Sequence, residues 1–478
     1  MSRSTAEAGT RQPNHRRARR RDRQVYLRSH PLLFALLAAS RGRPVRRIGR
    51  TLLVHDSDAY REALTRLRLD RTAEGTTGGA AQSALAGDAP DGGGMLFDQE
   101  GAAHRAERRS LAGHFGTEGL ERLRPVWQEV LDRELAPLAR GAHVDLVALA
   151  RELAGATTCA LLDCAAPPRA VADACARVAS ASIRAHLPGP GARRARNAAA
   201  HATAELQRVL GSDGDPLHAM VAVAAVNTTA AALPRAAAWC ADAGLWEQAE
   251  DAALRPALAD ELLRVTAPSP LLPRVAAEAG SVAGHPVRAG DRLLLVARHA
   301  VGAHRDDPDA HHPADPALTH LVFGAGPHTC PGARLARAQL ADTLATLAPL
   351  RPAVTHARAD RHAALPTWRA LSVRATAGAG REAHAESGQR TRPADTRFGS
   401  SDGTGDAVAH SHSTEAEASR RTCPVSGDGS NGTGNAAEQP HAAETKAGRR
   451  TRPADTDVDS MHVEGAAGQP HTTRKAPR

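Results

Sequence analysis

The sequence has few aromatic residues and almost no lysine. Aromatic side chains make up 2% of the 478 residues, and the only lysines are Lys446 and Lys475, although the formal net charge is +9. Arginine therefore carries the positive charge, and the abundance of Ala, Arg, Gly and Pro indicates a GC-rich genome before it indicates nucleic-acid binding. For the arginine-rich residues 16–23, a solvated disordered arm is favoured over a contact with nucleic acid or an acidic surface.

Cysteine and long apolar runs are scarce as well. The six cysteines form no CxxC pair and have no regular spacing, which argues against a disulfide framework or a zinc knuckle and is compatible with a reducing cytoplasm. One short apolar run, residues 31–40, follows the basic stretch in the manner of a signal peptide. That stretch is long for the start of a signal peptide, and the run is far too short to span a bilayer, so we expect a helix packed on the surface.

Apolar periodicity predicts a mainly helical domain between two segments that cannot bury a core. Residues 1–28 are expected to form a disordered basic arm, and residues 377–478 a disordered low-complexity tail. Within the tail, RTRPADT occurs at residues 390–396 and again at 450–456, which we interpret as a duplication scar rather than as a binding motif. Residues 29–376 remain as one large domain.

Strands are expected at few places in this domain. Two short strands should lie within residues 44–54, and Asp56 or Ser57 should cap the helix that follows them. Residues 283–296 are predicted to form a hairpin with a Gly-Asp turn. The Gly/Ala-rich residues 72–94 carry no pattern that would bury a side chain and are predicted to be a loop.

One cysteine lies in a glycine-lined loop that precedes a predicted helix. The loop is FGAGPHTCPG, residues 323–332. It contains three glycines, Gly324, Gly326 and Gly332. Glycine allows the backbone to approach a flat ligand closely, and the N–H groups at the mouth of a helix can hold the charge of a thiolate at Cys330. Phe323 can shield the sulfur and His328 lies two residues before it, so this cysteine suits a metal ligand.

Two other spacings pair polar residues along predicted helices. His104 and Arg108 stand four apart, so on a helix they share one face and can grip one anion together. Glu261 and Arg264 stand three apart, which by itself is typical of a solvated surface pair. Five histidines between residues 299 and 320 have no helical pairing opposite a carboxylate, so zinc is disfavoured.

The cysteine loop resembles the haem-binding loop of the cytochrome P450 family, F-x-x-G-x-H-x-C-x-G in its bacterial form. The resemblance extends over roughly residues 31–373, with the elements in the family's order. It implies the cytochrome P450 fold, mainly α with small β-sheets, in which a helical prism surrounds a buried haem. Residues 29–376 would then be a haem-thiolate catalytic domain that binds haem b through an axial thiolate from Cys330.

The same resemblance gives roles to the polar pairs. The haem propionates would pair with His104, Arg108, Arg274 and His328. The Glu261–Arg264 pair would be buried and would help to hold the cysteine loop, so that the loss of one partner costs about 3–5 kcal/mol.

A helix predicted from Pro216 carries AAVNTT at residues 224–229, in the place of the family's oxygen-activating A-G-x-D/E-T-T motif. Thr228 fits the hydroxyl that holds a water, whereas Asn227 replaces the acid and cannot release a proton near neutral pH. Ala225 replaces the usual glycine. Proton delivery would then run through water and Thr228, or the normal oxygen cycle would be slow. Pro234 should kink or end this helix early.

The resemblance implies a monooxygenase that inserts one atom of O2 into a small organic substrate, in bacterial secondary metabolism. Electrons would come from a ferredoxin or flavodoxin type donor with its reductase, and Arg105, Arg109 and Arg334 offer a dock for an acidic partner. A cytoplasmic monomer without a membrane span or a nucleic-acid partner is expected. The alternatives are a peroxide-driven or atypical haem-thiolate enzyme, and a haem-binding relative that has lost turnover.

Overall fold

The computed structural model describes residues 15–76, 79, 101–185, 192–211 and 216–376. The chain divides into two units, Met1–Asp395 and Thr396–Arg478, and all described residues belong to the first. The predicted tail with its repeat, residues 1–14 of the predicted arm, and residues 80–94 of the predicted loop lie outside the described residues.

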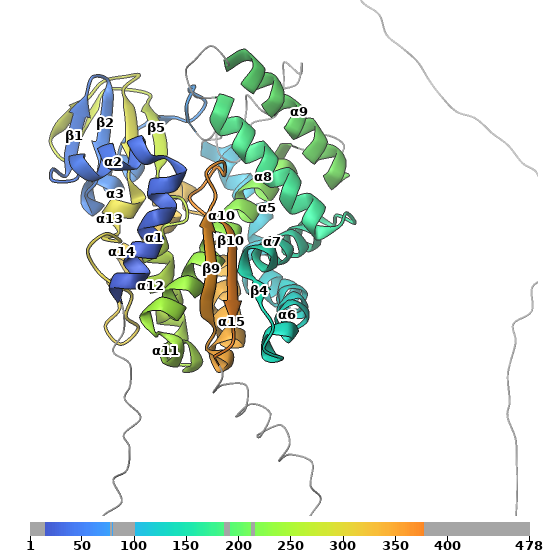
Figure 1. Ribbon diagram of the computed structural model, residues 1–478. Helices are drawn as coiled ribbons and strands as arrows, with labels where there is room; N and C mark the ends of the chain where they lie inside the picture. Colours follow the sequence, from blue (N-terminus) through green and yellow to red (C-terminus); the bar gives the residue numbers. More distant parts are fainter. Residues whose placement is uncertain (1–14, 77–78, 80–100, 186–191, 212–215, 377–478) are drawn as a thin grey trace, which may run out of the picture. The chain divides into compact units, whose positions relative to one another are not determined.

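Helices dominate the described part of the chain (Figure 1). The α-helices are α1 His15–Ser29, α2 Pro31–Ser40, α3 Ser57–Thr65, α5 Gly101–Phe115, α6 Thr117–Ala139, α7 Leu146–Leu162, α8 Pro168–Ala185, α9 Ala192–Leu210, α10 Pro216–Ala243, α11 Trp246–Glu250, α12 Arg255–Thr266, α13 Ala297–Ala300, α14 Pro316–Thr319 and α15 Ala333–Leu347. The short 3-10 helices are η1 His320–Phe323, η2 Gly326–His328 and η3 Ala348–Leu350. Helix α10 is the central element, because it packs against α1, α7, α8 and α12.

Three small sheets accompany the helices. The largest has the strand order β1-β2-β8-β5-β3, formed by Val45–Ile48, Thr51–Val54, Arg292–Leu295, Leu272–Ala276 and Leu69–Asp70. A second sheet has the order β4-β10-β9, formed by Val144–Asp145, Trp368–Arg374 and Ala353–Ala359. The third pairs β6 Gly280–Val282 with β7 His285–Val287. Mainly α architecture with small sheets agrees with the expectation from the sequence.

The first strands and the helix after them form where the sequence predicts. Strands β1 and β2 pair in antiparallel register from Val45↔Val54 to Ile48↔Thr51. Asp56 is the N-cap of α3, and its carboxylate accepts the N–H groups of Asp58 and Ala59 at 2.9 and 3.1 Å. These are local features, set by alternation and by capping chemistry.

The predicted hairpin over residues 283–296 is wrong in its pairing. Its two strands exist, but β7 pairs with β6 and β8 inserts between β2 and β5. Ala283 and Gly284 both have positive φ, +48° and +75°, which suits the two-residue turn of a tight hairpin, so this turn and not the Gly-Asp pair joins the paired strands.

The expectation of a disordered arm over residues 1–28 is wrong from His15 onward, because these residues form α1. Its buried residues recur at helical spacing, from Ala18 through Asp22 and Val25 to Tyr26. The Asp22 carboxylate accepts two hydrogen bonds from the guanidinium of Arg235, which is 1% exposed, and also pairs with Arg298 at 3.1 Å.

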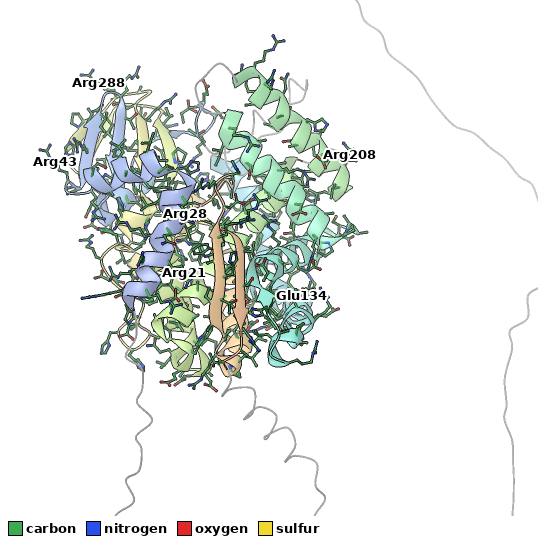
Figure 2. All side chains as sticks on the ribbon, viewed as in Figure 1. Arg21, Arg28, Arg43, Glu134, Arg208 and Arg288 are labelled. Atoms are coloured by element: carbon green, nitrogen blue, oxygen red, sulfur yellow. The ribbon has the colours of Figure 1, made fainter. Side chains whose placement is uncertain are left out.

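The arginines of α1 are also bound by distant acids. Arg17 and Arg21 both pair with Asp242, and Arg19 pairs with Asp307. Figure 2 labels Arg21 and Arg28 on α1. The basic stretch is therefore a docked helix. Three of its arginines are held by acids of other segments, and four others are exposed, namely Arg16, Arg20, Arg23 and Arg28. A sequence window cannot show this, because every partner lies more than 200 residues away.

Helix α10 continues through Pro234 to Ala243, so the prediction of an early end is wrong. Proline removes the N–H that would bond to the carbonyl four residues earlier. That carbonyl belongs to Ala230, and it accepts a hydrogen bond from the Thr367 hydroxyl at 3.2 Å instead. By length and composition, Leu217–Ala243 is apolar enough to cross a membrane, and here it is packed among other helices.

A buried histidine pair joins α13 to the residue that follows β2. His55 and His299 are 4% and 6% exposed, their Nδ1 atoms lie 2.9 Å apart, and His55 Nε2 lies 3.1 Å from the Ser40 hydroxyl. Burial lowers the pKa of His55 to about 4. Burial, together with His55 and His304, lowers the pKa of His299 to about 3.

Acid should destabilise the fold through this pair. Both folded-state pKa values lie below the ordinary value of 6.5, so the unfolded chain binds protons that the folded chain excludes. The free energy of unfolding should fall as the pH drops from about 6.5 toward 4, with a slope of up to about 1.4 kcal/mol per pH unit for each histidine. Urea denaturation between pH 7 and pH 4.5 measures this, and His299→Asn should flatten the profile whereas the exposed control His285→Gln should not. Identical profiles for the wild type and His299→Asn would contradict the assignment.

Candidate functional site

The cysteine loop runs from η1 through η2 to the start of α15, and its own backbone closes it. The Cys330 N–H donates to the Phe323 carbonyl at 2.9 Å. The N–H and the hydroxyl of Thr329 both donate to the Gly326 carbonyl, at 3.1 and 2.8 Å. The Phe323 ring is covered by the guanidinium of Arg337, 4.7 Å from the ring centroid. The sulfur is thus presented from a rigid turn at the mouth of a helix.

Opposing influences act on the Cys330 thiol. Burial raises the pKa of this thiol although the residue retains exposed surface, while the Gly332 backbone N–H and the cations of Arg108 and Arg337 lower it. Donors and positive charge aimed at a sulfur favour its thiolate form, which is the form that binds a metal. Burial outweighs these groups, so the pKa of the thiol is raised on balance, and the N–H and the two cations are the groups that would hold the negative charge once a metal binds the sulfur.

The three loop glycines serve different purposes. Gly324 and Gly326 have φ of +85° and +72°, where other residues are strained. A Cβ on Gly326 would lie 3.2 Å from the Leu64 carbonyl oxygen, so this glycine lets the loop approach α3 and not only a ligand. A Cβ on Gly332 would lie 3.8 Å from the Cys330 sulfur and 3.7 Å from the Phe115 ring.

Arginine and histidine side chains from four segments converge at the loop. The rings of His104 and His328 stack with centroids 3.9 Å apart, and Arg108 Nη1 donates to the Thr329 carbonyl at 2.6 Å. Burial, then Arg71, His104, Arg274 and Arg108, lower the pKa of His328 to about 3. Burial, then Arg71, lower the pKa of Arg274 to about 10. The structure thus brings together the four residues predicted to bind propionates.

Arg71 belongs to the same cluster and was missed in the sequence. The register of β3 with β5 pairs Leu69 with Ala276 and Asp70 with Val275, so the next position places Arg71 opposite Arg274. Like charges directly across a strand pair are destabilising unless an anion lies between them. The signal that could have found Arg71 is this strand pairing, which the neighbouring glycine-rich stretch obscures.

These residues fit haem. The charged groups that act on His328 are all cations or histidines, which suits a ligand carrying two carboxylates, and the cysteine loop offers a thiolate ligand beside them. Among the described residues, no group of three or more His, Cys, Asp or Glu side chains is arranged to hold a metal ion.

Asn227 and Thr228 lie on different faces of α10. The Thr228 hydroxyl donates to the Ala224 carbonyl at 2.8 Å, which leaves its oxygen as an acceptor. Asn227 Nδ2 donates to the carbonyls of Val223 and Cys175, at 2.8 and 3.2 Å, and so ties α10 to α8.

Glu261 and Arg264 are each 1% exposed and hydrogen-bonded to each other. Arg264 also donates to the carbonyls of Val301, Asp306 and Asp307, and Glu261 accepts the Ala314 N–H at 3.1 Å. The pair therefore holds the irregular segment between α13 and α14, which leads to the cysteine loop, rather than contacting Cys330.

Known proteins resemble the chain in sequence and in fold. No family model matches it. Pentalenic acid synthase from Streptomyces avermitilis is 30% identical over 286 residues, which cover 53% of this chain and 69% of that relative. The 20-oxo-5-O-mycaminosyltylactone 23-monooxygenase of Streptomyces fradiae is 38% identical over 103 residues, 21% of this chain and 24% of that enzyme. The match thus spans only about a quarter of the length of some curated relatives.

Among solved structures, the cytochrome P450 CYP109B1 from Bacillus subtilis superposes with a TM-score of 0.57 at 18% sequence identity, covering 73% of this chain and 100% of that one. Full-length CYP116B46 from Tepidiphilus thermophilus gives a TM-score of 0.60 at 20% identity, covering 78% of this chain and 55% of that one. The chain therefore has the fold of these proteins.

Neutralising the arginine pair should weaken haem retention. Arg71→Gln and Arg274→Gln each remove one cation that is expected to hold a propionate, and a lost charged hydrogen bond of about 1.5–3 kcal/mol corresponds to roughly 10- to 100-fold in affinity. Haem transfer to excess apomyoglobin measures the loss, and Arg61→Gln, which removes an exposed arginine paired with Asp58, serves as the control. Equal haem retention in all three variants would contradict the assignment.

Proposed function

Because the chain belongs to the cytochrome P450 family, we propose that it is a haem-dependent monooxygenase that inserts one atom of O2 into a small organic substrate. The observation that carries the proposal is the cationic cluster beside the cysteine loop, since its charges suit haem propionates and its position suits a thiolate ligand. Hydroxylation or epoxidation would be the reaction.

Each residue of the site has a role in this proposal. Bound through the Cys330 thiolate, haem b supplies the activation of dioxygen. The propionates would be held by His104, Arg108, Arg274, His328 and Arg71. The Gly332 N–H stabilises the sulfur's negative charge, and the Thr228 oxygen accepts a hydrogen bond from a water in the groove beside α10.

Two further features bear on substrate and partner. Relatives named for a tylactone glycoside, erythromycin and pentalenic acid support a natural product of bacterial secondary metabolism as the substrate. Arg105, Arg109 and Arg334 are exposed on α5 and α15, which suits docking of an acidic ferredoxin or flavodoxin type donor to a cytoplasmic monomer.

The absorption spectrum tests the proposal. Purified protein, reduced under carbon monoxide, should show the far red-shifted Soret band of thiolate-ligated haem, and Cys330→Ser should lose that band. Phe115→Leu, beside Gly332 on the same face of the loop, is the matched control that should keep it. Wild-type protein that purifies without haem and takes none up would end the proposal.

Asn227 favours a second candidate, a haem-thiolate enzyme driven by peroxide or one that has lost turnover. If proton delivery is limiting, Asn227→Asp should raise reductant-driven oxidation, by up to about 100-fold, and lower peroxide leakage. Asn227→Ala removes the same hydrogen bonds to Val223 and Cys175 without adding an acid, and is the control. An Asn227→Asp variant that matches Asn227→Ala in product and peroxide would overturn the role of this position in proton delivery.

A further inference from the structure

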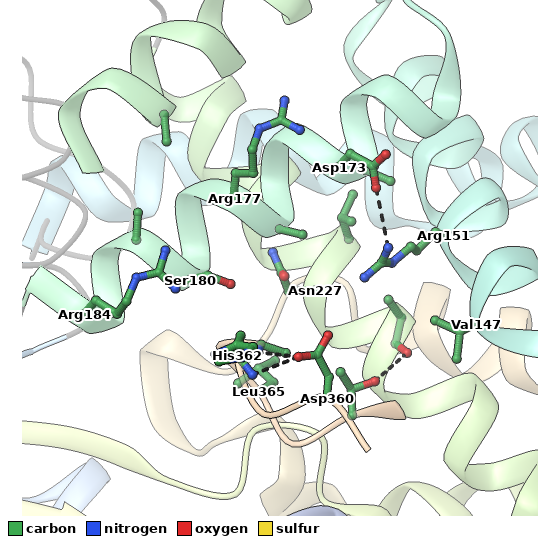
Figure 3. A pocket seen from close by; sticks show the side chains of 18 of the residues that line it. Val147, Arg151, Asp173, Arg177, Ser180, Arg184, Asn227, Asp360, His362 and Leu365 are labelled. Atoms are coloured by element: carbon green, nitrogen blue, oxygen red, sulfur yellow. Dashed lines mark hydrogen bonds and ion pairs between the residues drawn. The ribbon is translucent and has the colours of Figure 1, made fainter. Parts of the chain in front are cut away.

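A cavity of about 660 Å³ lies between α7, α8, α9, α10 and the loop that joins β9 to β10 (Figure 3). Its volume is that of a site for a drug-sized molecule. Asn227 lines it, whereas Cys330 and Thr228 do not. This cavity is therefore not lined by the residues that would hold haem, and its occupant is a separate question.

Much of the cavity wall is aliphatic. Val147, Val226, Ala230 and Leu365 contribute to it, and Trp368, which is 2% exposed, adds an aromatic face. The alanines of α8 and α9 that also line it leave room for a ligand and offer no polar group. A hydrocarbon body fits this wall.

Most of the arginines at the cavity are already paired. Arg151 pairs with Asp173 at 3.6 Å, and Arg177 with Glu205 at 2.7 Å. Figure 3 shows the first pair at one edge of the cavity. These four charges are balanced and provide no net attraction for a ligand.

Arg184 is different, because it is exposed to solvent where it lines the cavity and has no ion pair or hydrogen bond among the residues that the structure describes. It stands four residues after Ser180 on α8, so both side chains lie on one face of the helix, and Figure 3 shows them next to each other. A guanidinium fork beside a hydroxyl donor is a receptor for a carboxylate.

The opposite wall has the reverse polarity. Asp360 accepts the N–H groups of His362 and Ala363, at 2.8 and 3.1 Å, and has no cationic partner among the described side chains. Asn227 Nδ2 is engaged by carbonyls, which leaves the amide oxygen as an acceptor. An anionic group is repelled from this wall and is directed toward Arg184.

We propose that this cavity binds an amphipathic monocarboxylic acid, with its carboxylate on Ser180 and Arg184 and its hydrocarbon along the aliphatic wall. A carboxylic acid bound in this way is either a substrate that the enzyme oxidises or an effector that it leaves unchanged. If the acid is the substrate, the inference names its class and rests on the proposed function. Binding itself depends only on the cavity.

Calorimetric titration of the haem-loaded, full-length chain with decanoic acid tests the proposal. Decanoic acid should bind at least about tenfold more tightly than decan-1-ol, because the alcohol lacks the charge that Arg184 attracts. Arg184→Gln should weaken binding of the acid about tenfold and leave the alcohol unchanged. Arg169→Gln is the control, since it removes the same charge from α8 at a position that pairs with Glu134 and Glu152 outside the cavity.

Decanoic acid that does not bind, binds no better than the alcohol, or binds equally to Arg184→Gln would overturn the proposal. Where it binds, a shift of the Soret band toward the high-spin position marks a substrate near the iron, and an unchanged band marks an effector. The carbon monoxide spectrum is recorded on the same samples. A normal spectrum without acid binding rejects the cavity proposal alone, whereas acid binding to protein without a thiolate-haem spectrum rejects the proposed function alone.

Discussion

The positive charge gathered beside Cys330 is the feature on which the proposed haem site depends. Arg71 directly follows β3, which pairs with the strand of Arg274, and after burial these two arginines and Arg108 help to lower the pKa of His328. A fold does not gain stability from such a cluster, because like charges in partly buried surroundings repel one another. In the proposed function, a ligand with two carboxylates would offset this repulsion, which is why the loop, α5 and β5 suit a dianion.

Buried arginines elsewhere in the protein are paired with carboxylates and hold segments of the fold together. Arg235 and Arg264 are each 1% exposed, and both are held by a carboxylate and by backbone or hydroxyl acceptors. The guanidinium group is suited to buried pairing because its five donors have a fixed planar geometry. Three arginines of α1 are likewise held by acids of the same chain, Asp242 and Asp307.

Local chemistry could be predicted from the sequence, and long-range pairing could not. The capped helix after Asp56 follows from a few neighbouring residues. The docked α1 depends on Asp22 meeting Arg235, and the survival of α10 past Pro234 depends on Thr367, more than 130 residues away. The same holds for the site. The motif around Cys330 could be recognised in the sequence, whereas Arg71 could be found only from the pairing of β3 with β5.

Asn227 also makes a long-range contact, and this contact requires an asparagine rather than an aspartate. Its Nδ2 donates to two carbonyls, one on its own helix and one on α8, and an ionised aspartate offers no donor to either. A carboxylate placed there would face the oxygens of Val223 and Cys175, so it would have to turn toward the cavity or stay protonated. An acid near the oxygen groove and a hydrogen-bonded seam between α8 and α10 are therefore competing requirements at one residue. In this chain the hydrogen bonds between α8 and α10 are kept, and among the described residues the carboxylate at the cavity without a cationic partner is Asp360, on the loop between β9 and β10.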